Sequence, residues 1–259
     1  MRRSCPIPDT AATRRGHNAP VAPITFAHRG ARAVAPENTI DAFARALELG
    51  AGGLETDAWL SGDGQVVLVH SSHVRRGLRR LAVARTGVAG LAAVGVPRLT
   101  DLYRELGTTF ELSIDIKTPV VARPVLAVAE AAGALGRLWV CSPDLAVLAD
   151  LRAAIVDDDG ARPHLVHSRA RRHLPEPLER HAAALAADGI TAMNLHHTEW
   201  TAGLVALFHR FGLKALAWDA QEVRYIRAMV RMGVDGIYSD HVDRLVRTVA
   251  DPPARRSGR

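Results

Sequence analysis

The chain has 259 residues, of which 48% are hydrophobic and 23% are charged, values ordinary for a soluble globular protein with a large core. Its length suits a single α/β barrel domain, which typically takes about 250 residues. No stretch reaches the roughly 18 uncharged apolar residues of a membrane helix, so we expect no integral membrane segment. The two cysteines, Cys5 and Cys141, exclude a disulfide framework, and we expect a cytoplasmic protein.

The net charge of +6 and the pI near 10.1 would suit an anionic substrate, a nucleic acid or an acidic membrane surface. Much of the excess arginine stands in the two ends of the chain, and no recognised nucleic-acid motif accompanies it. We therefore expect no nucleic-acid partner. The sequence leaves the oligomeric state open.

The two ends of the chain are predicted to be disordered tails. Residues 1–22 are rich in Pro, Ala, Thr and Arg without periodicity, and residues 251–259 have the same character. Between these tails, residues 23–250 form one predicted domain.

Short β runs alternate with helical stretches along this domain. The predicted strands are 24–28, 53–60, 66–70, 110–117, 138–142, 164–168, 192–196, 214–218 and 236–239. The predicted helices are 39–49, 121–132, 144–155, 177–187, 199–211, 223–232 and 242–249, with Asn38 or Thr39 as the N-cap of the first. Residues 71–109 lack a clean βα repeat and are predicted to form an insertion or a lid.

The strand count favours a parallel barrel. Ser61-Gly62-Asp63-Gly64 joins two of the β runs as a hairpin, and counting that hairpin as one unit leaves eight β units. Alternation of eight β units with helices predicts a TIM (β/α)8 barrel, with a doubly wound open sheet as the alternative. In a barrel the active site lies at the C-terminal strand ends, where His28, His70, His196 and Trp218 fall.

Charged residues inside two of the predicted strands point to a metal and phosphate site. Residues i and i+2 of a strand face the same side, so Glu55 pairs with Asp57, and Asp115 with Lys117. Three carboxylates would cost stability in a core but are the oxygen ligands that a hard divalent ion prefers. Arg29 and Lys117 are the natural phosphate-binding cations.

Histidines provide candidate acid and base groups. His28 and His70 end two strands that can be neighbours, and imidazoles with pKa values near neutrality could act as general base and general acid. Of the adjacent residues His196 and His197, at most one is expected to contact substrate. Three further histidines are expected at the surface: His167, His173 and His181. Trp218 is expected to belong both to the core and to the pocket wall.

Taken together, these motifs resemble the glycerophosphodiester phosphodiesterase family. The matching segments are His28-Arg29-Gly30, Pro36-Glu37-Asn38-Thr39, Glu55-Thr56-Asp57, Asp63-Gly64, Val66-Val67-Leu68-Val69-His70, Ile114-Asp115-Ile116-Lys117, Ala217-Trp218 and Asp235-Gly236-Ile237-Tyr238-Ser239-Asp240. They span nearly all of residues 24–245 in the family's order.

The resemblance implies a TIM-barrel hydrolase that cleaves a small phosphodiester into glycerol 3-phosphate and an alcohol. It implies one divalent ion, Mg²⁺ or Ca²⁺, held by Glu55, Asp57 and Asp115. It also implies His28 and His70 as the acid/base pair, and it assigns phosphate or substrate binding to Arg29, Lys117 and Trp218.

Three positions depart from the family pattern. Ser71 stands where Asp usually follows the second histidine, Asp115 replaces a longer Glu, and Asp219-Ala220-Gln221 replaces Thr-x-Asn. Two alternatives therefore stay open: a phospholipase D-like or cyclising lyase that acts on a lysolipid or sphingolipid, and a non-catalytic phosphodiester-binding descendant. The retention of both histidines and all three carboxylates argues against the second.

Overall fold

The computed structural model describes residues 22–155, 160–174 and 177–251. The two predicted tails therefore lie outside the described residues, apart from positions 22 and 251. Within the described ranges, no helix is both long enough and apolar enough to cross a membrane.

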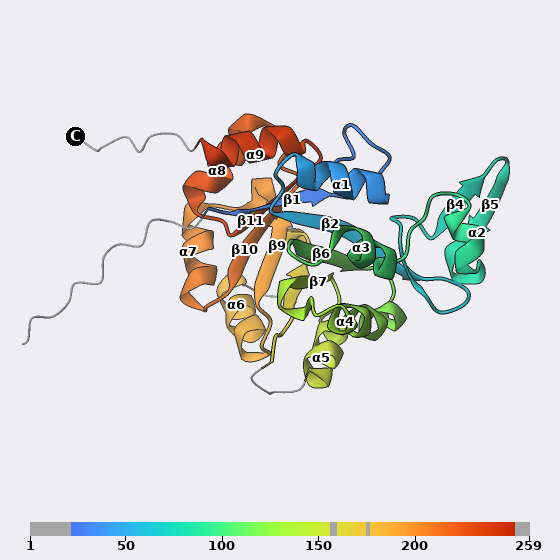
Figure 1. Cartoon of the computed structure of the whole chain (residues 1–259). Helices are drawn as coiled ribbons and strands as arrows, with labels where there is room; N and C mark the ends of the chain where they lie inside the picture. Colours follow the sequence, from blue (N-terminus) through green and yellow to red (C-terminus); the bar gives the residue numbers. More distant parts are fainter. Residues whose placement is uncertain (1–21, 156–159, 175–176, 252–259) are drawn as a thin grey trace, which may run out of the picture.

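Eight parallel strands close into a barrel in the described part of the chain (Figure 1). The strands are β1 (Ile24–His28), β2 (Gly53–Leu60), β6 (Glu111–Ile116), β7 (Leu138–Ser142), β8 (His164–Ser168), β9 (Ala192–His196), β10 (Lys214–Trp218) and β11 (Gly236–Ser239). Each strand pairs with the next in chain order, and β1 pairs with both β11 and β2. This closure confirms the predicted TIM barrel and excludes the open sheet.

Helices connect the strands and surround the barrel. They are α1 (Ile40–Glu48), α3 (Leu99–Leu106), α4 (Ala122–Ala131), α5 (Leu145–Ala154), α6 (Leu178–Ala187), α7 (Ala202–Arg210), α8 (Val223–Met232) and α9 (Val242–Ala250). Thr39 is the N-cap of α1, because its side chain accepts a hydrogen bond from the Ala42 amide. Short 3₁₀ turns precede several elements: Val83–Arg85, Pro119–Val121, Leu135–Arg137, Arg171–His173 and His197–Glu199.

Helix α3 is the barrel helix that the sequence did not separate from the predicted insertion. It has only eight residues, and Asp101, Arg104 and Glu105 interrupt its apolar pattern. Its buried side is nevertheless continuous, because Leu99, Leu102 and Tyr103 pack into the core between helices and strands.

Aromatic side chains fill the barrel interior below the cavity described in the next section. The Phe26 ring stacks on Tyr238 with 4.6 Å between centroids and meets Trp139 edge-on at 5.9 Å. A Cβ atom added at Gly53 would lie 2.7 Å from the Phe26 ring, so this strand position requires glycine. The filled interior gives the carboxylates above it a rigid floor.

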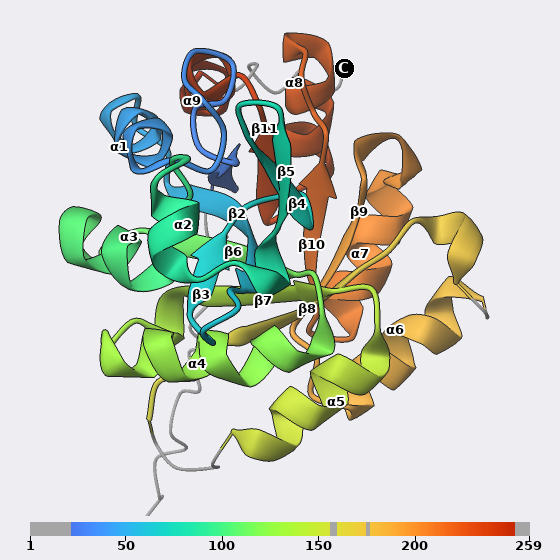
Figure 2. The ribbon, with the colours of Figure 1, turned by 90° about the vertical axis from the view of Figure 1, so that its right-hand side faces the viewer.

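An insertion leaves the barrel after β2. It contains β3 (Val66–Leu68), which pairs antiparallel with β2, then β4 (His73–Arg76), β5 (Arg79–Ala82) and α2 (Val88–Ala92). Figure 1 shows β4, β5 and α2 projecting beyond the end of the barrel, and Figure 2 shows them from that end. The predicted strand 66–70 was too long, because the chain bends after Leu68. The β4–β5 hairpin was not predicted.

Candidate active site

A cavity of about 500 Å³ opens at the C-terminal ends of the barrel strands. Its lining residues come from most of the barrel strands or the loops that follow them: His28, Arg29, Glu55, Asp57, His70, Ser113, Asp115, Lys117, Ser168, Arg169, Ala170, Asn194, Trp218, Asp219 and Tyr238. All eight site residues predicted from the sequence are in this set. His70 is the residue of the insertion in this set, and no residue between 71 and 98 is among them, so β4, β5 and α2 do not form the cavity wall.

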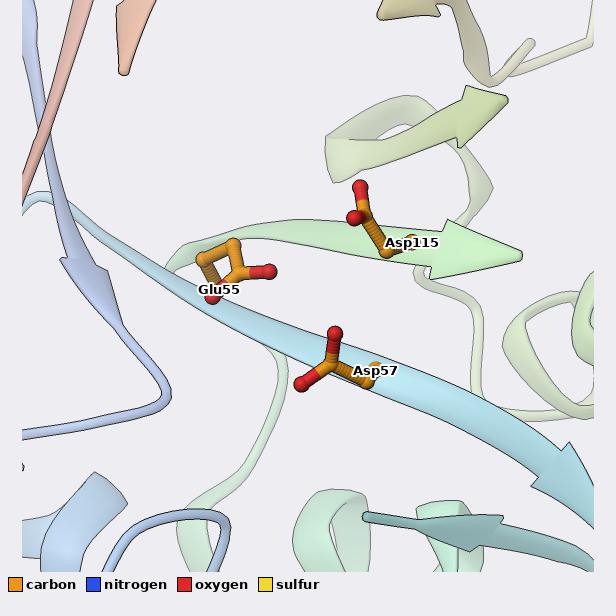
Figure 3. Close-up of side chains that lie close together, drawn as sticks. All are labelled: Glu55, Asp57 and Asp115. Carbon is orange, nitrogen blue, oxygen red and sulfur yellow. The ribbon is translucent and has the colours of Figure 1, made fainter. Parts of the chain in front are cut away.

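The three predicted metal ligands form a carboxylate cluster on two adjacent strands (Figure 3). Glu55 and Asp57 alternate along β2, and the register places Asp115 of β6 directly beside Asp57. One oxygen from each carboxylate lies within 4.8 Å of the others. Burial raises the pKa of Glu55 to about 8, and the nearby carboxylates add to the rise. A cation among these oxygens would remove the cost of ionising them together.

Lys117 and Arg29 already direct positive charge at this cluster. The Lys117 Nζ lies 2.6 Å from Asp57 Oδ1 and 3.4 Å from Asp115 Oδ2. The Arg29 Nε lies 3.3 Å from Asp57 Oδ2, and its Nη1 donates to Glu37 at 3.1 Å. Burial opposes ionisation of Asp57, but the charges of Lys117 and Arg29 outweigh it and lower its pKa.

Backbone geometry at residues 29 and 38 shapes the cluster. Arg29 has a φ of 55°, and its amide donates to Glu55 Oε2 at 2.9 Å. Asn38 has a φ of 57° and is buried, and its Nδ2 donates to Asp57 Oδ2 at 3.1 Å. The Asn38 Oδ1 in turn accepts from Thr56 Oγ1 at 2.7 Å. The sequence suggested only a capping role for Asn38, whereas the structure shows that it orients a carboxylate.

His28 ends β1 and faces the cluster. Its Nδ1 lies 2.6 Å from Asp240 Oδ1, and its Nε2 lies 3.8 Å from Glu55 Oε2. Burial lowers its pKa, but the charges of Glu55 and Asp240 outweigh burial and raise it overall. Asp240 is itself fixed, because its amide donates to Gln221 Oε1 at 2.9 Å. The sequence did not assign a role to Asp240, although the Ser239-Asp240 motif contained it.

His70 reaches the cavity from a bend rather than from a strand end. The Val69 amide donates to the Asp57 carbonyl at 2.9 Å, which holds the following residue beside the cluster. The His70 ring makes no hydrogen bond to the described residues, and burial lowers its pKa. The prediction that His28 and His70 end neighbouring barrel strands was therefore wrong for His70, because β3 ends at Leu68 and lies outside the barrel.

The aromatic and histidine predictions at β9 and β10 need correction. Trp218 lines the cavity but is 36% exposed, so it is a pocket wall and not a core residue. His196 packs edge-on against Trp218 with 4.6 Å between centroids, and its Nε2 lies 3.3 Å from Asp219 Oδ2. Neither His196 nor His197 lines the cavity.

Two histidines expected at the surface are buried. His167 is the penultimate residue of β8 and His181 lies on the inner side of α6, and each is 1% exposed. The rings share a hydrogen bond of 3.0 Å between His167 Nδ1 and His181 Nε2, and His167 Nε2 donates to the Pro143 carbonyl at 3.3 Å. Mutual hydrogen bonding explains how the interior accommodates them. His173 is exposed, as predicted.

The closed barrel, the carboxylate cluster and the convergent cations define the class of protein: a TIM-barrel enzyme whose mouth suits an anionic substrate. The model of the glycerophosphoryl diester phosphodiesterase family matches residues 28–244. The chain therefore belongs to this family of phosphodiesterases.

Individual relatives agree in sequence and in fold. A glycerophosphodiester phosphodiesterase of Caldanaerobacter subterraneus subsp. tengcongensis is 27% identical over 244 residues, which are 87% of this chain and 97% of the relative. The crystal structure of the Thermotoga maritima glycerophosphodiester phosphodiesterase has a TM-score of 0.76 at 22% identity, over 87% of this chain and 97% of that one. An Oleispira antarctica phosphodiesterase in complex with the product sn-glycerol-3-phosphate has a TM-score of 0.74 at 18% identity, over 89% and 98%.

Proposed function

We propose that this protein hydrolyses glycerophosphodiesters to glycerol 3-phosphate and an alcohol with one divalent metal ion, Mg²⁺ or Ca²⁺. The observation that carries the proposal is the meeting of three carboxylates, two cations and two histidines around one cavity. The names of the relatives and the product complex of the Oleispira antarctica enzyme support the choice of substrate. We expect the reaction to take place in the cytoplasm.

The carboxylate cluster fits a hard divalent ion. Glu55, Asp57 and Asp115 offer oxygens only, and burial together with the two aspartates raises the pKa of Glu55, so a bound cation would favour its ionised form. When bound, the ion supplies a Lewis acid that polarises the phosphoryl oxygen and neutralises charge developing in the transition state.

Arg29 and Lys117 bind the phosphate group in this proposal. Both line the cavity, and both are held there by Asp57, so neither needs to be reoriented when a diester enters. Trp218 offers its exposed ring to the alcohol part of the substrate. The departure at Asp219-Ala220-Gln221 lies beside this wall, and Gln221 is occupied in fixing Asp240.

His28 and His70 form the acid/base pair in this proposal. Because the Asp240 carboxylate accepts at Nδ1 of His28, the proton of the neutral ring sits on Nδ1. The Nε2 atom, which faces the cluster, is then the atom that accepts or donates a proton during catalysis. His70 borders the same cavity, and its ring is available to handle the other proton.

A metal-supplemented activity screen tests the proposal. The substrates are glycerophosphocholine, glycerophosphoethanolamine, glycerophosphoglycerol and lysolipids, and released glycerol 3-phosphate is measured enzymatically. We expect activity that is lost in excess EDTA and restored by Mg²⁺ or Ca²⁺. Asp115→Asn should weaken metal binding measured by calorimetry, whereas Asp150→Asn, at an exposed residue that pairs with Arg123, should not.

Full activity in excess EDTA, with no metal in the protein, would contradict the metal requirement. A cyclic phosphate as the final product would identify the lyase alternative. Binding of these diesters without turnover of any of them would identify a non-catalytic binding protein.

A further inference from the structure

The β4–β5 hairpin carries four arginines around its turn. Residues 75–80 read Arg-Arg-Gly-Leu-Arg-Arg, and all six are exposed. The strand register places Arg75 opposite Arg80 and Arg76 opposite Arg79. None of the four guanidinium groups forms an ion pair or hydrogen bond with the residues that the structure describes.

No charge interaction within the described chain stabilises these four paired arginines. Like charges directly opposite one another destabilise an antiparallel pair, and no carboxylate of the described chain offsets these four. In the barrel mouth, by contrast, Lys117 and Arg29 each lie beside carboxylates. Charge that is left uncompensated on a projecting element fits an anionic partner that comes from outside the molecule.

The tip of the hairpin adds an apolar group between the arginines. Gly77 has a φ of 59° and precedes Leu78, so the two form the central residues of a tight turn with the left-handed position at glycine. Leu78 is fully exposed, with 105% relative accessibility. An apolar tip flanked by cations matches the layering of a bilayer interface, where acyl chains lie just below anionic head groups.

We propose that this hairpin docks the protein on an anionic lipid bilayer, with Leu78 entering the acyl boundary and the four arginines contacting lipid phosphates. The inference is independent of the proposed function, because it uses no residue of the cavity. A nucleic acid would engage the arginines but would give Leu78 no apolar environment. Because β2 and β3 lead the chain directly from the cluster into the insertion, docking holds the barrel mouth toward the lipid surface (Figure 2).

Vesicle flotation with the full chain tests this inference. The probes are vesicles of phosphatidylcholine alone and vesicles containing 30% phosphatidylglycerol. We expect binding to the anionic vesicles only, weakened about 30-fold by the double variant Arg76→Gln/Arg79→Gln, since each arginine near the surface contributes on the order of fivefold. Leu78→Ser should weaken binding to the same vesicles by about tenfold.

The matched control removes the same charge elsewhere. Arg227 and Arg231 are exposed on α8 and have no ion pair with the described residues, so Arg227→Gln/Arg231→Gln lowers the net charge equally. This control should reduce binding by less than about threefold, because the two α8 arginines lie outside the docking hairpin. All variants keep the basic ends of the chain, so any contribution of those ends is the same in each. Activity on a water-soluble diester should be unchanged in the hairpin variants.

Three results would overturn the proposal. The first is absence of binding to anionic vesicles, and the second is an equal loss in the hairpin and α8 double variants. The third is binding that Leu78→Ser leaves unchanged while a single-stranded oligonucleotide competes for the hairpin, which would indicate a nucleic-acid partner instead. Circular dichroism of each variant confirms that the barrel is folded.

Discussion

The barrel mouth and the β4–β5 hairpin are both rich in charged residues, but the cations are paired with carboxylates only in the mouth. In the mouth, Lys117 lies between two aspartates, and Arg29 lies beside Asp57 and Glu37. In the hairpin, four arginines face one another in exposed pairs. The mouth is organised in advance for a small ligand, whereas the hairpin leaves its charge available to a surface.

Burial makes the two regions differ in their response to salt. Asp57 is 1% exposed, so its contacts with Lys117 and Arg29 are only weakly screened. The hairpin arginines are exposed, and at physiological ionic strength their field falls off over about 8 Å. We therefore infer that chemistry in the mouth tolerates salt, while attachment through the hairpin does not.

The largest expected effect lies in the mouth. His28→Ala and His70→Ala should each lower kcat on a glycerophosphodiester by roughly 10²–10⁴-fold, as expected for loss of a general acid or base. Steady-state kinetics with saturating metal measure the effect. His173→Ala, an exposed histidine outside the cavity, serves as the matched control and should retain wild-type kcat.

The same kcat measurement tests whether the barrel mouth and the hairpin act separately. Arg76→Gln/Arg79→Gln removes two charges from the hairpin and should leave kcat on the water-soluble substrate unchanged. Near-wild-type turnover in either the His28 or the His70 variant would remove that residue from the mechanism. A large loss in the hairpin variant would show that the two regions are not separate in function.

The second largest effect is expected at His167, beside the barrel mouth. Protonation of this buried ring would create a cation with no anion of the described chain to compensate it. Burial lowers the pKa of His167 to about 4, and the neighbouring His181 and Arg169 add to the fall. An unfolded histidine titrates near 6.5, so between pH 6.5 and 4 the unfolded chain binds more protons than the folded chain. The free energy of unfolding therefore decreases as the pH is lowered through this range. This group should cost about 3 kcal/mol of unfolding free energy between pH 7 and 4.

His167→Asn isolates this contribution, because its side-chain carbonyl can still accept from His181. Urea unfolding of both proteins at pH 7 and pH 4 gives the difference in free energy. We expect the variant to lose about 3 kcal/mol less than the wild type over this range. An equal loss in the two proteins would show that His167 does not titrate as a buried, uncompensated group.

Sequence reasoning reached the barrel and the carboxylate cluster because local patterns determine both. The period of two in β2 and β6 puts Glu55 with Asp57 on one face, and the order of elements places β2 beside β6. Asp240 and Asn38 were missed because their partners lie 212 and 19 residues away, and only the closed fold brings them together.

Other errors came from side chains whose surroundings the sequence does not specify. His167 and His181 look like surface residues until β8 and α6 bury them against each other. His70 looks like a strand end because Val69 continues an apolar run, yet the chain bends after Leu68. The hairpin escaped prediction because β4 and β5 are arginine-rich and lack an alternating apolar face.

A smaller effect is expected at Ser71, where the family pattern has Asp. The His70 ring has no hydrogen-bond partner among the described residues, so a carboxylate at position 71 could orient it. Ser71→Asp should raise kcat/KM by up to about fivefold and move the His70 limb of the pH–rate profile upward, because a nearby anion favours the protonated imidazole. Ser71→Asn, which adds similar bulk without charge, is the control. Unchanged or lower kcat/KM at every pH would show that position 71 does not act through His70.

The smallest effect is expected for a substitution within the hairpin that gives an arginine a carboxylate partner, as in the barrel mouth. Arg80→Glu replaces a repulsive cross-strand pair with an attractive one, since Arg80 lies opposite Arg75. The gain should be less than about 1 kcal/mol, because exposed ion pairs are weak. Amide hydrogen exchange across β4 and β5 measures it as exchange slowed by up to about fivefold, since this projecting element can open without the barrel.

Arg80→Gln removes the repulsion without adding attraction and should slow exchange by a smaller factor. The ordering matters more than the size: Glu slower than Gln, and Gln slower than Arg. The same two variants should bind anionic vesicles in the reverse order, because each step that stabilises the free hairpin removes charge from the docking surface. Exchange that is fastest in the Glu variant would mean that the arginines do not repel one another across the hairpin, and the contrast with the compensated mouth would then lose its electrostatic basis.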